Sequence, residues 1–227
     1  MGRSFESQRC PSARIRATRW LCAARARLGT SSARRRFEAT RLRNDLTIVP
    51  LRGNVDTRLK RVADGELDAA ILATAGLNRL GAHREEVELV ELDERDFLPA
   101  GGQGALCIEA TAGRPIGGAV ELDDTVAALD NERAHREVAA ERAFLAALGA
   151  SCVSPVGVKA TAANSGLAIR ALLFSIDGTR NLSDELRDES AVLVTAGATT
   201  IEASERLGAV LADRMLAQGA RLLLGDG

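Results

Sequence analysis

The sequence lacks the features that mark several classes of protein. No apolar run approaches the roughly 18 residues that a membrane-spanning helix needs. The four cysteines are scattered without a CxxC pair, which excludes zinc-site spacing and the density of a disulfide-rich secreted domain. The two histidines, His83 and His135, lie far apart, so we expect no metal site. The formal net charge is only -1, and it favours neither nucleic acid nor a membrane surface as a partner.

What remains is an ordinary globular composition. The 227 residues are 46% hydrophobic, which is enough to bury the core of one or two domains. Scattered cysteines are typical of a reducing compartment, so we expect a cytoplasmic protein.

Residues 1–27 differ from the rest of the chain. Seven arginines stand there against the single acid Glu6, with no sustained helical or strand period. The segment can be a basic arm for nucleic acid, which predicts salt-sensitive binding, or an organelle transit peptide. A wrong start or a shifted reading frame in a GC-rich gene would produce the same jumble, and we favour that reading.

From Leu28 to Leu80 the pattern predicts strands that alternate with short helices. Gly29 is expected to make a turn, and the hydroxyl residues after it an N-cap. The strands are expected at 46–49 and 67–75, and the helices from 33, over 57–62 and over 76–80. This alternation predicts a parallel, doubly wound α/β sheet.

The middle of the chain is less regular. Residues 87–92 and 105–109 are strand-like, and Cys107 in the second run is expected to be a small core residue. The longest amphipathic pattern, over 123–148, predicts one helix.

The pattern of hydrophobic and turn-forming residues changes after Pro155. Residues 156–187 read as strands joined by hairpin turns at Asn164-Ser165-Gly166 and Asp177-Gly178. A final helix is expected from about 201 to 218. This part therefore predicts a small α+β domain.

Cys152 stands on a loop of small residues that follows the long helical pattern and ends at Pro155. Such a loop exposes a side chain and fixes its direction, as a nucleophilic thiol requires. A buried structural thiol is the other reading, and spacing alone favours it.

Five arginines form a second group of candidate functional residues. They are Arg34, Arg35, Arg52, Arg58 and Arg79. The planar, permanently charged guanidinium binds carboxylates with two parallel hydrogen bonds. At a helix start beside Ser32, Arg34 and Arg35 would be joined by backbone N–H donors and the positive end of the dipole. The alternative is a set of solvated surface arginines.

Five segments, in the same order, resemble the porphobilinogen deaminase family. They are Gly29–Arg35, Leu51–Arg58, Ala73–Gly81, Leu98–Gly104 and the stretch from Glu141 to Gly157 that contains the cysteine loop. The resemblance covers about Leu28 to Gly227. Two positions of the cysteine loop depart from the family pattern: Ala150 replaces the usual glycine, and Ser154 replaces a β-branched residue.

The resemblance implies a fold. It is an α/β protein with a doubly wound, periplasmic-binding-protein-like domain, the first family domain being largely missing, and a small C-terminal α+β domain. Residues 28–96 would form the central α/β domain, and 97–122 the segment that returns to the missing first domain. Residues 123–227 would form the C-terminal domain with the cofactor cysteine.

The resemblance also implies a chemistry. The family is a transferase, hydroxymethylbilane synthase, which condenses four porphobilinogen units into hydroxymethylbilane with release of ammonia, in haem biosynthesis. Its dipyrromethane cofactor would be attached covalently through Cys152. The expected cofactor-binding residues are Ser32, Arg34, Arg35, Arg52 and Gly53, and the expected substrate-binding residues are Arg58 and Arg79. Porphobilinogen is the implied small-molecule partner, and a monomer is expected.

One part of the family pattern has no counterpart in the sequence. The Ser-Leu-Lys-Asp segment with the catalytic aspartate is absent, so no catalytic residue is identified. Because the loss of one electrostatic stabiliser costs about 3–4 kcal/mol, we expect little or no activity from this chain. The alternative function is a non-catalytic ligand-binding module of the periplasmic-binding-protein type, which would not need a nucleophilic thiol.

Overall fold

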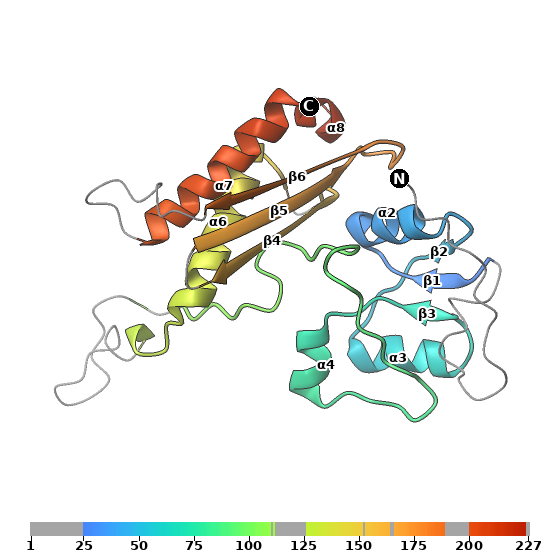
Figure 1. Ribbon diagram of the computed structural model, residues 1–227. Helices are drawn as coiled ribbons and strands as arrows, with labels where there is room; N and C mark the ends of the chain where they lie inside the picture. The colour runs from blue at the N-terminus through green and yellow to red at the C-terminus, as the bar shows by residue number, and fades with distance from the viewer. Residues whose placement is uncertain are drawn as a thin grey trace, which may run out of the picture. The chain divides into compact units, whose positions relative to one another are not determined.

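The structure is a computed structural model of the 227-residue chain, and it describes residues 25–109, 111, 126–151, 153–163, 166–188 and 200–225. The chain divides into two compact units between Asp93 and Glu94. Each unit has its own three-stranded sheet (Figure 1). Most of the basic N-terminal segment, residues 1–24, lies outside the described residues.

The first unit is built on a parallel sheet with the strand order β2-β1-β3. The strands are β1 (Arg27–Gly29), β2 (Thr47–Val49) and β3 (Ala69–Ala70). Helix α2 (Ala33–Leu42) joins β1 to β2, α3 (Val55–Ala63) joins β2 to β3, and α4 (Thr74–Leu80) follows β3. The first connection leads from β1 to β2 on one side, and the second passes back over β1 to β3 on the other side, as in a doubly wound sheet. The predicted parallel pairing is confirmed.

Gly29 is the last residue of β1, and the prediction of a turn there is wrong. A Cβ atom at this position would lie 2.7 Å from Leu67 Cδ1 and 2.8 Å from Leu51 Cδ2. Both leucines are buried. The glycine therefore serves close packing over the strand rather than a change in chain direction.

The second unit is built on an antiparallel sheet with the order β4-β5-β6. Its strands are β4 (Val156–Ala163), β5 (Gly166–Phe174) and β6 (Asn181–Asp188), and its helices are α6 (Glu132–Leu148), α7 (Thr200–Ala217) and the short α8 (Ala220–Leu224). Helices α6 and α7 lie against one face of this sheet (Figure 1). The predicted run of strands with a final helix is confirmed.

The core of this unit lies between the sheet and the two long helices. Val158 pairs with Ala171 and Ala160 with Ile169, and all four side chains are fully buried on the face below the helices. Helix α7 crosses α6 at Gly208. A Cβ atom there would lie 2.1 Å from the carbonyl oxygen of Ala140, so this crossing requires glycine.

Strand β4 forms one edge of the sheet, and its outward N–H groups have partners from outside the sheet. Ala160 N–H donates to Glu141 Oε1 (2.8 Å) and Ala162 N–H to Glu137 Oε1 (2.9 Å), both on α6. Val158 N–H donates to the carbonyl oxygen of Pro99 (2.9 Å). An edge covered in this way is protected from pairing with another strand.

Glu141 also fixes the connection that precedes α6. Its Oε2 accepts a hydrogen bond from Gly102 N–H (2.6 Å), so one buried carboxylate holds the 97–104 connection, α6 and β4 together. Burial raises the pKa of Glu141, and the hydrogen bonds from Gly102 and Ala160 oppose that rise.

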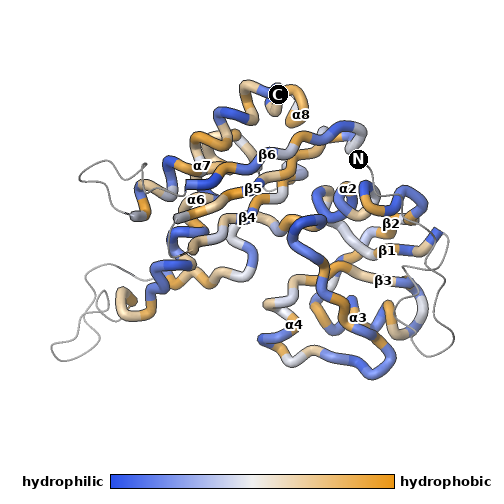
Figure 2. The backbone as a smooth tube through the Cα atoms, viewed as in Figure 1, coloured by the Kyte–Doolittle hydropathy of each residue, from blue (hydrophilic) through white to orange (hydrophobic). Residues whose placement is uncertain are grey.

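Three strand predictions are wrong in part or in whole. The apolar run 67–75 contains β3 as predicted, but only Ala69 and Ala70 belong to this strand, because α4 begins at Thr74. Residues 87–92 form no strand. Figure 2 shows most of the connection after α4 as hydrophilic, and its only bridge pairs Arg84 with Val87 among the described residues.

The third wrong strand is 105–109, and the core assignment of Cys107 is wrong with it. The cysteine is exposed, and its neighbours Leu106 and Ile108 are 78% and 54% exposed. The described part of this segment joins neither sheet.

The predicted helix over 123–148 is interrupted. Residues 126–127 are helical, a turn follows them, and α6 starts at Glu132, where Asn131 caps it by accepting a hydrogen bond from Ala134 N–H (2.9 Å). Residues 123–125 of the predicted helix lie outside the described residues.

Within the described ranges, every helix is too short or too polar to cross a membrane.

The glycine at the α6–α7 crossing gives a first prediction. We expect Gly208→Ala to destabilise the second unit by about 1–3 kcal/mol, because the methyl group must push the helices apart. Chemical denaturation followed by circular dichroism measures this change. Gly76→Ala in α4 is the matched control: a Cβ there meets nothing within 4 Å, so stability should be unchanged or slightly increased. Equal effects of both changes would contradict the tight crossing.

The buried carboxylate gives a second prediction. In Glu141→Gln the amide NH₂ would face one of the two N–H donors, so we expect a loss of about 1–3 kcal/mol. In the folded state the pKa of Glu141 lies above its ordinary value of 4.5. At pH values below 4.5, the protonated Glu141 side chain therefore makes its full contribution to the free energy of unfolding. The advantage of the wild type over the variant should therefore shrink as the pH rises through the raised pKa.

Urea unfolding at a series of pH values measures both effects. The exposed Glu205→Gln in α7 should change stability by less than about 0.5 kcal/mol. If the stability advantage of the wild type over Glu141→Gln grew with pH, the pKa of Glu141 would not be raised in the folded state.

Candidate functional site

The candidate site lies at the carboxyl edge of the parallel sheet, where the loops after β1, β2 and β3 meet. Thr30 N–H donates to Val49 O (3.0 Å), which ties the first loop to the end of β2. The Ser31 hydroxyl donates to Leu51 O and accepts from Leu51 N–H, both at 3.0 Å. The loops after β1 and β2 are therefore held as one surface.

Helix α2 starts at this edge. Ser32 is its N-cap, as the sequence predicts, and its Oγ accepts a hydrogen bond from Arg35 N–H (3.4 Å). The Thr30 hydroxyl accepts in turn from Ser32 N–H (3.2 Å). These contacts place Arg34 and Arg35 in the first turn of the helix.

Arg34 is a buried cation with a buried counter-ion. Its Nη1 donates to Glu38 Oε2 at 2.7 Å, and the two side chains are 7% and 0% exposed. Burial lowers the pKa of Arg34, and the charge and hydrogen bond of Glu38 oppose this. The pair lies one helical turn apart on α2, at the spacing that brings side chains together.

Arg35 and Arg58 complete a group of guanidiniums. Arg35 Nη1 donates to Ile71 O (2.8 Å), directly after β3, and Arg58 Nε donates to Gly53 O (2.9 Å), in the loop after β2. Burial lowers the pKa of Arg35 most, and the charges of Arg34 and Arg58 lower it further. Arg34 and Arg58, from two different helices, thus both act on Arg35 at this edge of the sheet, and we call the three residues the arginine cluster (Arg34, Arg35, Arg58).

Gly53 allows this arrangement through its backbone. Its φ of +107° lies in the region that favours glycine, and a Cβ atom would lie 3.0 Å from Thr57 Cγ2. Asn54 follows as the N-cap of α3 and accepts from Thr57 N–H (2.9 Å). The loop therefore directs the Gly53 carbonyl to Arg58, which sequence reasoning did not anticipate.

The other two predicted arginines are exposed. Arg52 lies in the loop after β2, and Arg79 lies in the last turn of α4. The structure therefore brings Arg34, Arg35 and Arg58 together and places Arg52 and Arg79 on the surface of the same unit.

Cys152 lies outside the described residues. Its neighbours lie between α6, whose C-cap is Gly149, and β4. Ser151 N–H donates to Ser154 Oγ (2.9 Å), and Ser154 N–H donates to Ser151 O (3.0 Å). The flanking Val153 is 77% exposed.

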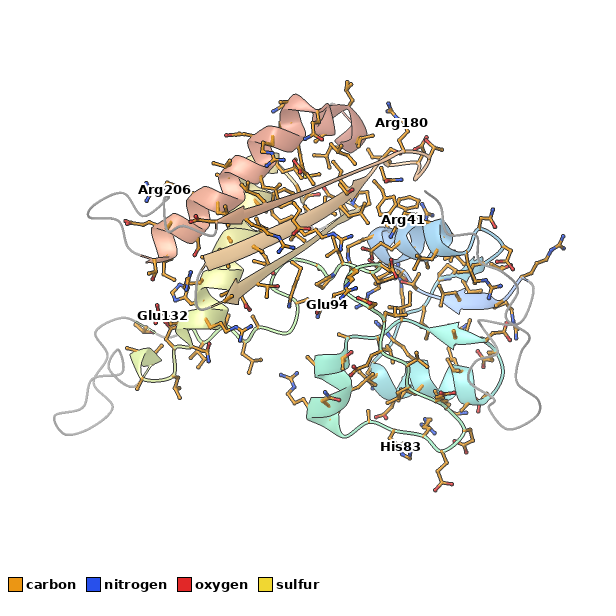
Figure 3. All side chains as sticks on the ribbon, in the orientation of Figure 1. Arg41, His83, Glu94, Glu132, Arg180 and Arg206 are labelled. Atoms are coloured by element: carbon orange, nitrogen blue, oxygen red, sulfur yellow. The ribbon has the colours of Figure 1, made fainter. Side chains whose placement is uncertain are left out.

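The histidines belong to different units. His83 lies on the connection after α4 (Figure 3), and His135 lies on α6 with its Nδ1 3.0 Å from Asp130 Oδ2. In the described part of the chain, no group of three or more His, Cys, Asp or Glu side chains is placed to hold a metal ion.

Sequence reasoning missed Glu38 and gave no role to Glu141. The four-residue spacing between Arg34 and Glu38 on a predicted helix was the available signal for the first. No local pattern reveals that Glu141 reaches Gly102 and Ala160, because both partners are distant in the sequence.

The fold and these contacts define a class: an α/β protein with a cationic group at the carboxyl edge of a parallel sheet, beside the point where the strand order reverses. Proteins of this class bind ligands at that edge. Comparison with known families is more specific. The family model described as porphobilinogen deaminase, dipyromethane cofactor binding domain, matches residues 16–115, and the one described as porphobilinogen deaminase, C-terminal domain, matches residues 135–217.

The chain is similar to curated proteins named porphobilinogen deaminase. It is 41% identical to that of Roseiflexus sp. (strain RS-1) over 199 residues, and 40% identical to that of Thermobifida fusca (strain YX) over 202 residues. That of Rubrobacter xylanophilus is 40% identical over 200 residues. The matches cover 88% of this chain, so the chain belongs to the porphobilinogen deaminase family.

The chain spans about 59–60% of the length of these relatives.

The arginine cluster gives a third prediction. We expect Arg35→Gln to weaken binding of pyromellitate, a planar benzene tetracarboxylate, about tenfold or more, since a charged hydrogen bond is worth about 1.5–3 kcal/mol. Isothermal titration calorimetry at low salt measures the affinity. Arg41→Gln is the control on the same helix, in its last turn (Figure 3), and should leave the affinity unchanged. Equal losses in both variants would mean nonspecific attraction.

Proposed function

We propose that this chain serves the porphobilinogen deaminase reaction, the stepwise condensation of four porphobilinogen units into hydroxymethylbilane with release of ammonia. The arginine cluster at the carboxyl edge of the first sheet is the observation that carries the proposal. We further propose a doubly wound, periplasmic-binding-protein-like arrangement for 28–96 and a cytoplasmic, monomeric protein. In the same proposal, residues 97–122 belong with a further domain, and 123–227 form the C-terminal domain.

The chemistry of the ligand fits the cluster. Each pyrrole unit carries an acetate and a propionate, so a growing chain accumulates negative charge with every addition. Burial lowers the pKa of Arg35 most, and the charges of Arg34 and Arg58 lower it further, so an arriving carboxylate relieves repulsion as well as adding hydrogen bonds. A neutral ligand would leave that repulsion in place.

The same residues fit a dipyrromethane cofactor. We assign Ser32, Arg34, Arg35, Arg52 and Gly53 to the cofactor and Arg58 and Arg79 to the incoming substrate. The N-terminal turn of α2 adds backbone N–H donors beside Ser32 for the same carboxylates. When bound, the cofactor supplies the free pyrrole end to which new units are added.

Cys152 is the proposed point of covalent attachment. Thiolate is the reactive form of cysteine, and a short loop of small residues leaves room for a bulky substituent. The mutual hydrogen bonds of Ser151 and Ser154 hold the ends of this loop together, which supports a defined direction for whatever the loop presents.

The residues of this chain bind and orient; proton transfer is not assigned to any of them. The family's aspartate segment has no counterpart in this sequence, so we propose little or no turnover by the chain alone. Binding of the cofactor and catalysis are therefore separate questions for this protein.

The fourth prediction tests attachment. We expect the chain, produced in cells that make porphobilinogen, to carry two pyrrole units on the peptide that contains Cys152, as read by mass spectrometry of the intact protein and its fragments. Cys152→Ser should abolish the added mass. Cys107→Ser is the matched control, because it removes another cysteine that is exposed and should keep the adduct.

An adduct on Cys107, or measurable bilane formation by a chain whose Cys152 is unmodified, would refute the assignment. An unmodified chain without activity that still binds pyromellitate would favour the non-catalytic ligand-binding module.

A further inference from the structure

The Arg34–Glu38 pair has a feature that anion binding alone does not explain. A carboxylate beside the arginines does not increase the affinity of such a site for a polyanion. Glu38 is nevertheless fully buried, with its Oε2 2.7 Å from Arg34 Nη1. A buried charge without a counter-ion lowers stability, so one of these two side chains is buried in order to compensate the charge of the other.

The carboxylate acts on more than one arginine. Arg35, the next residue, is held on Ile71 O, and Arg58 approaches from α3 with its Nε on Gly53 O. The charges of Arg34 and Arg58 lower the pKa of Arg35, whereas the charge of Glu38 raises it. Glu38 therefore opposes the surrounding positive charge at both Arg34 and Arg35.

We infer that Glu38 is a positioning residue that sets the charge of the ligand edge: it fixes Arg34 and reduces the arginine cluster from three net positive charges to two. The inference rests on the proposed function and refines the role of Arg34 in it. Arg34 then acts together with Glu38 as a neutral, rigid unit, and Arg35 and Arg58 supply the net attraction.

A reduced charge suits a site whose ligand grows and must leave. An edge that binds every carboxylate with full strength lowers the energy of bound intermediates and product along with that of the reacting species, which does not accelerate turnover. A carboxylate partner for Arg34 limits this overbinding while it keeps the helix start ordered.

The fifth prediction concerns Glu38→Gln, which keeps the side-chain shape and an oxygen acceptor but removes the charge. We expect pyromellitate to bind about three- to thirtyfold more tightly at low ionic strength, with the gain shrinking as salt is added. Glu66→Gln is the matched control, since Glu66 also pairs with an arginine of the first unit, Arg61 (2.8 Å), but on the surface. It should leave the affinity unchanged.

A second variant covers the case in which Glu38→Gln does not fold. Glu38→Met removes the same charge and fills the buried position with an apolar side chain of similar length, so a similar gain in affinity is expected. Unchanged or weaker binding of pyromellitate by whichever of the two variants folds would overturn the inference.

A second probe separates this inference from the proposed function. Inorganic sulfate is a small anion that binds where positive charge is concentrated. The rise in melting temperature that sulfate causes therefore measures the positive charge at the site. If sulfate stabilises Glu38→Gln more than the wild type while pyromellitate binds neither, the role of Glu38 holds and the carboxylate ligand is wrong. If pyromellitate binds both equally and the gain with sulfate is also equal, the proposed ligand stands and the role of Glu38 is wrong.

Discussion

The placement of the Arg35 guanidinium beside two further cations, Arg34 and Arg58, at one sheet edge is the constraint on which the first unit depends. Arg34, Arg35 and Arg58 come from two helices, and each has a partner that exists only in the folded sheet or helix: Glu38, Ile71 O and Gly53 O. Parallel strands bring their carboxyl ends to one edge, so these partners arise together when the sheet forms. The same order that holds the cations apart prepares them for an anion, because little reorganisation remains for binding.

In the second unit, the constraint is an exposed sheet edge, and side chains of a helix satisfy it. Its sheet has an edge at β4, and carboxylates of α6 accept the outward N–H groups of that strand. Glu141 also holds Gly102, so the connection before α6 is part of the unit rather than a loose linker. Because α6 and β4 are fixed to each other, the short loop between them, which contains Cys152, has fixed ends. A loop anchored in this way is compatible with the covalent attachment that we propose for Cys152.

The sequence predicts the regular elements well where local signals agree. The Ser32 cap, the antiparallel strands after Pro155 and the final helix have strong local signals, and the structure has them, whereas the predicted turn at 164–165 lies outside the described residues. It fails where tertiary contacts decide: Gly29 makes room for Leu51 and Leu67, and an alanine-rich run gives only two strand residues. Cys107 was assigned to a core from its apolar neighbours, but those neighbours are exposed. At the site, residue types predicted the arginines, whereas Glu38 and the carbonyl partners depend on geometry.

The central claim is that Arg35 and Arg58 bind one anionic ligand together at the carboxyl edge of the first sheet. Side-chain NMR of arginine labelled with ¹⁵N tests it directly, because each Nε–H group gives its own signal. During titration with pyromellitate, the account predicts that the signals of Arg35 and Arg58 shift together and saturate with one dissociation constant. The signals of Arg41 and of Arg180, which directly precedes β6 in the second unit (Figure 3), should stay in place. Equal, unsaturated shifts at all four arginines, or silence at Arg35 and Arg58, would contradict it.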